Sequence, residues 1–173
     1  RYARMVGKEW WARLKSRNGL TLVRTTYEFP MYVRVGDPGL SRQLVVNRQR
    51  EVLASTYFRE DLEDGMTVLE TGANIGYFTL LSLSSHPMCK VISFEPVVEN
   101  VDVLRRNLVL NGVADRVEVY PYACGDKEGV SEFYVSSLSN AGNMIRKTEN
   151  TAAVREVRVV RLDDFLKERK DID

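Results

Sequence analysis

Short apolar runs alternate with amphipathic segments through the centre of the chain. The three runs, which predict strands, are MTVLE at 66–70, KVISFE at 90–95 and RVEVYP at 116–121. Residues 74–85 and 99–112 carry apolar positions at helical spacing and predict helices, the first opened by Asn74 and the second ended by Gly112. Strands and helices joined in this order by short connections indicate a right-handed βαβαβ unit around a parallel sheet. The pattern therefore predicts an α/β fold.

The N-terminal region follows other patterns. Residues 1–17 combine apolar residues with six basic ones and predict an amphipathic helix, whose tryptophans we expect to pack on the domain. The alternative is that this basic face lies on a membrane surface or a partner. Residues 21–35 are rich in β-branched and aromatic residues and predict extended structure, followed by a turn at 36–39.

A further helix is predicted to begin at Asn47, a suitable N-cap, and to end near Leu62. Its spacing directs Val52, Leu53 and Tyr57 toward the core.

Beyond the central unit, residues 130–135 and 156–161 predict two strands, and LDDFLKERK at 162–170 predicts a short helix. The polar loop between the strands includes Asn140, Asn143 and Arg146. Loops of this length are usually functional or disordered, so this one either covers an acceptor or is a disordered hairpin tip.

Length and charge narrow the class of protein. At 173 residues the chain fits one domain, and we divide it into an N-terminal cap segment, residues 1–46, and a ligand-binding domain, residues 47–173. A net charge of +1 gives no electrostatic footprint for nucleic acid. No apolar run reaches the roughly 20 residues of a membrane span. The two cysteines indicate no disulfide framework, so we expect a cytoplasmic protein.

Candidate chemistry lies in ETGANIGYF, residues 70–78, where the first strand turns into the first helix. Ligands of open parallel sheets bind at the carboxyl ends of the strands, and Gly72 and Gly76 either let a ligand approach the backbone or allow close helix–strand packing. A dinucleotide fingerprint needs glycines where this chain has Asn74 and Tyr77, so a nicotinamide-dependent oxidoreductase is disfavoured.

Two carboxylates at neighbouring strand ends favour a different ligand. Glu70 can accept hydrogen bonds from an ammonium group, directly or through water, and can also stabilise the N-terminus of the next helix. Glu95, which ends the second strand, can accept both hydroxyls of a ribose. Together they suit S-adenosylmethionine, whose adenine we expect near Ala123, Cys124 and Asp126, beyond the third strand.

Four ordered segments resemble the FkbM-type methyltransferases. They are residues 65–80, 91–112, 117–129 and 157–166, so the likeness covers about residues 65–166. The resemblance implies a Rossmann-like class I methyltransferase sheet with flanking helices, S-adenosylmethionine as cofactor, and O-methylation of a small-molecule or sugar hydroxyl. It also implies that Asn107 and the Asn111–Gly112 pair are structural.

The family motifs and the strand ends together give one set of expected cofactor-binding residues. The set is Glu70, Gly72, Ala73, Asn74, Gly76, Glu95, Pro96, Ala123, Cys124 and Asp126.

One departure from the family concerns the C-terminus. The family continues past its LDDF helix into a fourth strand, whereas this sequence stops at Asp173. We therefore expect a fold truncated after the third central strand plus a β-hairpin, with part of the acceptor pocket outside this chain. The open edge of the first strand is then expected to be poorly ordered or to pair with another chain, for example by self-association.

The sequence offers no strong catalytic base. His86 follows the first helix and is expected at the opposite end of the sheet from the ligand. Asp126 is a weak candidate, and one histidine with two distant cysteines does not make a metal cluster. A non-catalytic module that binds the cofactor or a partner is therefore the main alternative to an enzyme.

Overall fold

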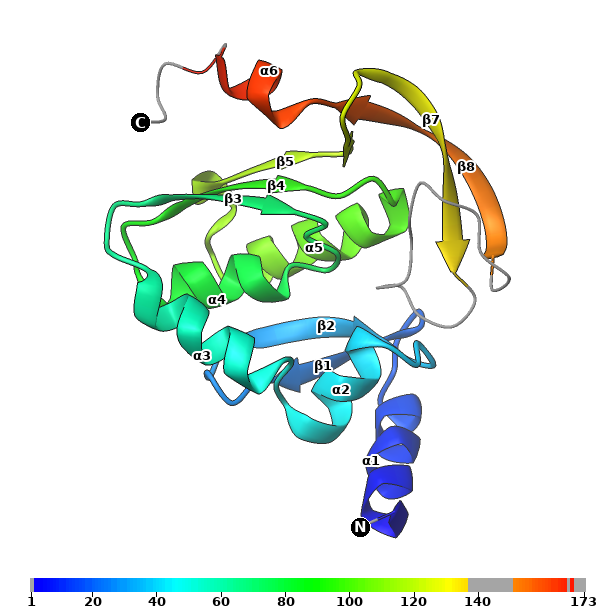
Figure 1. The fold of residues 1–173 in the computed structure, drawn as a ribbon. Helices are drawn as coiled ribbons and strands as arrows, with labels where there is room; N and C mark the ends of the chain where they lie inside the picture. Colours follow the sequence, from blue (N-terminus) through cyan, green and yellow to red (C-terminus); the bar gives the residue numbers. More distant parts are fainter. Residues whose placement is uncertain (1, 137–150, 168, 170–173) are drawn as a thin grey trace.

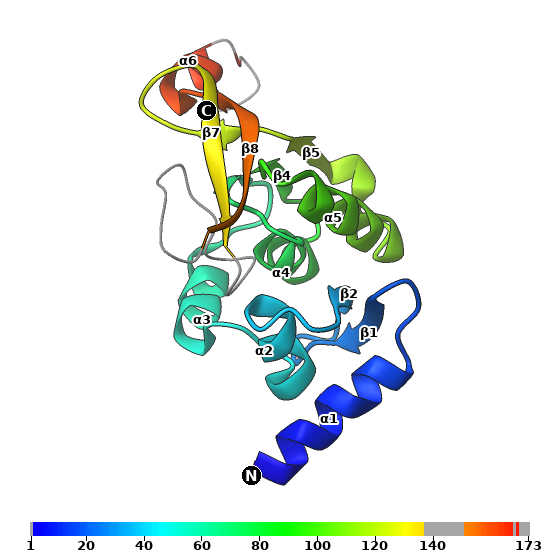
Figure 2. The same cartoon turned by 90° about the vertical axis from the view of Figure 1, so that its right-hand side faces the viewer.

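A three-stranded parallel sheet lies at the centre of the computed structural model, which describes residues 2–136, 151–167 and 169 (Figure 1). The sheet consists of β3 (Thr67–Thr71), β4 (Lys90–Phe94) and β5 (Val117–Tyr120), in the order β3-β4-β5. The connecting helices α4 (Tyr77–Ser85) and α5 (Val98–Leu110) lie together on one face of it (Figures 1 and 2). The predicted βαβαβ unit is confirmed.

Strand register brings the carboxyl ends of β3 and β4 together. Glu70 pairs with Ser93, and Thr71 pairs with Phe94. β3 has β4 as its single neighbour among the described strands, in agreement with the predicted open edge.

The opposite face of the sheet is covered by α6 (Leu162–Lys167). The Phe165 ring of α6 lies against Phe94 and Tyr120, with ring centroids 5.1 and 5.0 Å away. The two predicted C-terminal strands are confirmed as β7 (Gly129–Ser136) and β8 (Thr151–Val160), which run antiparallel. The short β6 (Ala123–Cys124) pairs with β8, and a 3₁₀ turn, η1 (Ala114–Arg116), precedes β5.

The predicted extended region folds into an antiparallel hairpin of β1 (Leu20–Arg24) and β2 (Pro30–Arg34). Asn107 of α5 attaches β2 to the rest of the fold. Its Oδ1 accepts from the Tyr32 N–H at 2.6 Å, and its Nδ2 donates to the carbonyls of Tyr32 and Ile75 at 3.1 and 2.9 Å. Asn111 Nδ2 donates to the Pro30 carbonyl at 2.9 Å, so both asparagines have the structural role implied by the resemblance.

The helix predicted over residues 47–62 is present at residues 52–61, so its end was predicted and its start at Asn47 was wrong. α2 (Leu40–Asn47) ends at the proposed N-cap, and α3 (Val52–Asp61) starts five residues later. Arg48 and Glu51 adopt left-handed conformations, with φ of 60° and 42°, which break the helix and rotate the face that α3 presents. The expected core residues Val52, Leu53 and Tyr57 are therefore exposed, while Ser55 is buried.

The tryptophans predicted to pack on the domain are exposed. α1 (Tyr2–Leu14) is a helix as expected, yet Trp10 and Trp11 are each 58% exposed. Its other face contacts α2 through polar groups: Glu9 pairs with Arg42 at 2.6 Å, and Lys8 Nζ donates to a backbone carbonyl. Within the described residues, no helix combines the length and apolar character needed to cross a membrane.

Candidate functional site

The turn between β3 and α4 is folded by three residues with positive φ. They are Gly72, Asn74 and Gly76, with φ of 72°, 54° and 87°. The N–H groups of Gly72 and Ala73 both donate to the Phe94 carbonyl, at 2.8 and 3.0 Å, so the turn is attached to the end of β4. α4 begins only at Tyr77, so Asn74 belongs to this turn and does not open the helix as expected.

The two glycines of this turn have different surroundings. A Cβ on Gly76 would lie 2.3 Å from the Leu104 Cδ1 atom of α5, so a bare backbone is needed there for helix packing. A Cβ on Gly72 would meet nothing within 4 Å. Gly72 therefore borders open space, where a ligand can approach the backbone, and Gly76 does not.

This open space is a cavity of about 430 Å³ at the carboxyl ends of β3 and β4. Its walls come from α2, α3, β3, α4, β7 and the connections between them. The lining residues are Leu40, Arg50, Phe58, Val68, Leu69, Glu70, Thr71, Gly72, Ala73, Asn74, Tyr77, Phe78, Glu95, Pro96 and Phe133.

Glu95 connects the turn to the start of α5. Its Oε2 accepts from the Asn74 N–H at 2.8 Å, and its Oε1 accepts from the Val97 N–H at 2.9 Å and from Asn100 Nδ2 at 3.1 Å. Burial raises the pKa of this carboxyl, and the two backbone donors oppose the shift. An ionised carboxylate has about four acceptor positions, so these three bonds leave Glu95 room for a further donor.

The Glu70 side chain extends from β3 to contact β4 and α4. Its Oε2 accepts from the hydroxyls of Thr79 and of Ser93, the latter at 3.3 Å. Burial raises the pKa of Glu70 from 4.5 to about 7, although the bonds from Thr79 and Ser93 act in the opposite direction. Thr79 lies in the first turn of α4, so Glu70 both supports that helix and lines the cavity.

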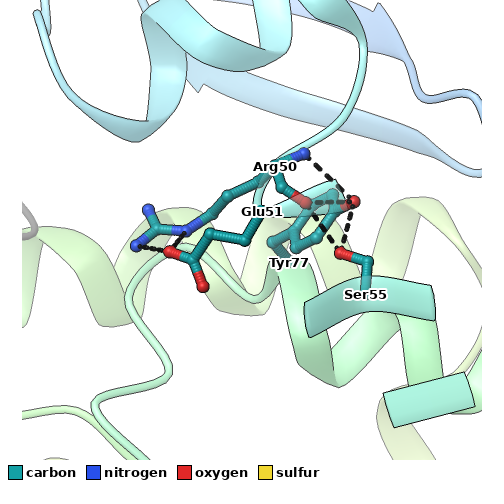
Figure 3. Close-up of polar contacts among 4 residues, drawn as sticks. All are labelled: Arg50, Glu51, Ser55 and Tyr77. Atoms are coloured by element: carbon teal, nitrogen blue, oxygen red, sulfur yellow. Dashed lines mark hydrogen bonds and ion pairs between the residues drawn. The ribbon is translucent and has the colours of Figure 1, made fainter. Parts of the chain in front are cut away.

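Arg50 and Tyr77 line the cavity and were missed in the sequence (Figure 3). The Arg50 N–H donates to the Tyr77 hydroxyl at 3.2 Å, and Ser55 Oγ donates to the Arg50 carbonyl at 2.7 Å. The predicted helix places Arg50 in its first turn, although residues 47–51 (NRQRE) contain no apolar position. That polar run is the signal that indicates a connection at this point.

The predicted residues thus fall into two groups, apart from Gly76, which lies against Leu104. The cavity brings together Glu70, Gly72, Ala73, Asn74, Glu95 and Pro96.

The residues expected near adenine lie outside this cavity. Ala123 is buried in β6, while Cys124 and Asp126 line a second cavity of about 450 Å³ that shares Thr71 with the first. Burial raises the pKa of the Cys124 thiol to about 11, so it stays protonated at neutral pH. His86 follows α4, at the end of that helix away from the turn, as expected.

Comparison with known proteins agrees with this architecture. The profile of the family described as "Methyltransferase FkbM domain" matches residues 70–173. The chain belongs to the FkbM methyltransferase family. This confirms the resemblance seen in the sequence motifs.

Two curated relatives each match about half of this chain. "Methyltransferase sdnD" of Sordaria araneosa is 29% identical over 92 residues, which are 53% of this chain and 36% of that protein. "31-O-demethyl-FK506 methyltransferase FkbM" of Streptomyces tacrolimicus is 37% identical over 84 residues, which are 47% of this chain and 32% of that protein. The chain thus spans about one third of the length of these relatives.

A solved structure shares the fold of this FkbM-family chain. P. horikoshii TYW2, in complex with MeSAdo, aligns with a TM-score of 0.50 and 20% identity, over 64% of this chain and 38% of that one. The Rossmann-like fold class, with a parallel sheet and flanking helices, is confirmed.

Proposed function

We propose that this domain binds S-adenosylmethionine and transfers its methyl group to a hydroxyl of a small molecule or sugar. The observation that carries the proposal is the cavity where Glu70, Gly72 and Glu95 meet. Two carboxylates and the open backbone position of Gly72 line it, at the edge where open parallel sheets bind their ligands.

Each part of the cofactor has a matching group. The remaining acceptor position of Glu95 suits a ribose hydroxyl, and Glu70 in its ionised form suits the ammonium group. The open space beside Gly72 lets the ligand lie against the backbone. Ala123, Cys124 and Asp126 stay our prediction for the adenine end, reached past Thr71, which both cavities share.

The names of the relatives support this chemistry. One is described as a 31-O-demethyl-FK506 methyltransferase, which is an O-methylating activity, and the TYW2 structure contains MeSAdo. The cofactor supplies an activated sulfonium methyl, so the chain's task is mainly to hold donor and acceptor in line. Asp126 remains a weak candidate for the base.

Calorimetric titration tests the proposal. The chain should bind S-adenosylmethionine and S-adenosylhomocysteine in preference to NAD. Glu95→Ala should weaken that binding more than tenfold, because a hydrogen bond to a charged group contributes roughly 1.5–3 kcal/mol. Glu60→Ala, an exposed glutamate of α3, is the matched control and should bind as the wild type does. Preference for NAD, or unchanged affinity in Glu95→Ala, would remove the assignment.

A second candidate function is a binding module without turnover that associates through the open edge of β3. The observation behind it is that β3 lacks a second neighbour among the described strands. Light scattering should then show a concentration-dependent dimer. A monomer at every concentration would exclude self-association. Methyl transfer from S-adenosylmethionine to a hydroxyl acceptor would favour the enzyme.

A further inference from the structure

The charges around the cavity at the carboxyl ends of β3 and β4 are unequal. Two carboxylates, Glu70 and Glu95, line it, and Arg50 is the single cationic side chain among the described lining residues. A ligand held by the carboxylates through an ammonium and a ribose would leave a negative group to be matched. The guanidinium of Arg50 is the group available for it.

Arg50 is held in place by its backbone. Its N–H and carbonyl are bound by Tyr77 of α4 and Ser55 of α3, and the Tyr77 hydroxyl lies 3.3 Å from Ser55 Oγ (Figure 3). The connection between α2 and α3 is thus fixed against α4, the helix that follows the glycine turn. Hydrogen bonds of this kind, made by groups that do not contact the ligand, hold a binding side chain in position.

The guanidinium is partly buried and only partly used. Its side chain is 19% exposed, and Nε and Nη2 both lie 2.7 Å from Glu51 Oε1. A guanidinium has five N–H donors, so the contact with Glu51 leaves three for another acceptor. Glu51 itself is 47% exposed, so it balances the charge of Arg50 without closing access to it.

We propose that Arg50 forms a carboxylate subsite, which binds the α-carboxylate of the cofactor's amino-acid end. This rests on the proposed function, since it assigns a residue to one group of S-adenosylmethionine. The guanidinium fork matches a carboxylate in two parallel hydrogen bonds, and partial burial strengthens such a pair relative to one in water. Glu70 and Arg50, lining one cavity, would then hold the ammonium and the carboxylate of the same amino acid.

Ligands that differ in this one group test the subsite. Decarboxylated S-adenosylmethionine keeps the adenosine, the sulfonium and the ammonium but lacks the carboxylate. Calorimetry should show that the wild type binds it at least tenfold more weakly than S-adenosylmethionine. In Arg50→Gln, S-adenosylmethionine should lose at least tenfold in affinity, while the decarboxylated ligand changes less than twofold.

Two further variants keep the test decisive. Arg59→Gln, an arginine of α3 that does not line the cavity, should leave both affinities unchanged. Arg50→Lys keeps the charge but loses the fork, so it should show an intermediate loss confined to S-adenosylmethionine, and it replaces Arg50→Gln if that variant does not fold.

The outcomes separate the two proposals. Equal loss for both ligands in Arg50→Gln and Arg50→Lys would assign Arg50 a structural role and overturn the subsite. Unchanged affinity for both ligands in these variants would also overturn the subsite. If the wild type binds neither ligand, the proposed function itself fails.

Discussion

Glu70 should make the folded state less stable as pH rises toward neutrality. Burial raises the pKa of this carboxyl from 4.5 to about 7 in the folded chain. The folded state therefore holds the proton more tightly than the unfolded state does. Stability is highest while the carboxyl is protonated in both states, and it falls as pH rises from about 4.5 to about 7, where the unfolded chain releases the proton first.

The size of the effect follows from the difference in pKa. The folded and unfolded pKa values differ by roughly 2.5, and each pKa unit corresponds to about 1.4 kcal/mol. The expected loss of stability above pH 7 is therefore about 3 kcal/mol. Glu70→Gln removes the titration and keeps an oxygen that can accept from Thr79. The free energy of unfolding of Glu70→Gln, relative to that of the wild type, should therefore rise by about 3 kcal/mol between about pH 4.5 and pH 8.

Urea denaturation at a series of pH values measures this difference. The pKa of Glu95 is also raised by burial, but Glu95 is present in both proteins, so its own titration largely cancels in the comparison. Glu60→Gln, an exposed carboxyl of α3, is the control and should follow the wild type at every pH. Parallel curves for Glu70→Gln and the wild type would show that Glu70 titrates normally and would refute the argument.

Two other predictions concern stability. Gly76→Ala should lower the free energy of unfolding by about 2 kcal/mol or more, because the new Cβ meets Leu104 at a position with φ of 87°, whereas Gly72→Ala, with open space, should lose only about 1 kcal/mol. Equal losses in the two denaturation curves would contradict the different surroundings of the glycines. Asn107→Ala should cost about 2–4 kcal/mol, because it removes the partner of the part-buried Tyr32 N–H and carbonyl and of the buried Ile75 carbonyl. A loss below about 1 kcal/mol would show that the β1–β2 hairpin is held by other contacts.

The central sheet could be predicted because its signals are local. Apolar runs such as residues 66–70 and the spacing across α5 depend on neighbours in the sequence, and the structure follows them closely. The parallel register that brings Glu70 level with Ser93 follows from the same βαβ connection. The sequence pattern therefore predicts the position of Glu95 beside the glycine turn.

The break between α2 and α3 has a local signal, the polar run at residues 47–51, but its geometry could not be predicted from neighbouring residues. Arg48 and Glu51 carry no local preference for a left-handed conformation, and the connection is fixed by Tyr77, which lies 27 residues from Arg50 in the sequence. The exposed side of α1 was likewise not predicted, and α1 contacts α2 through an ion pair of Glu9 and Arg42, which are far apart in the sequence. Long-range polar contacts of this kind leave no periodic trace in a sequence.

The hydrogen bond between Tyr77 and the Arg50 backbone connects the cavity to residues that precede the family match. The family match starts at Glu70, yet Leu40, Arg50 and Phe58 of the cavity wall come from the preceding segment. Because Tyr77 of α4 binds the Arg50 backbone, any movement of that connection changes the cavity wall beside the turn. The region before residue 70 therefore contributes to the cavity, and a truncation at the family boundary would remove the cavity's single described cation together with one of its walls.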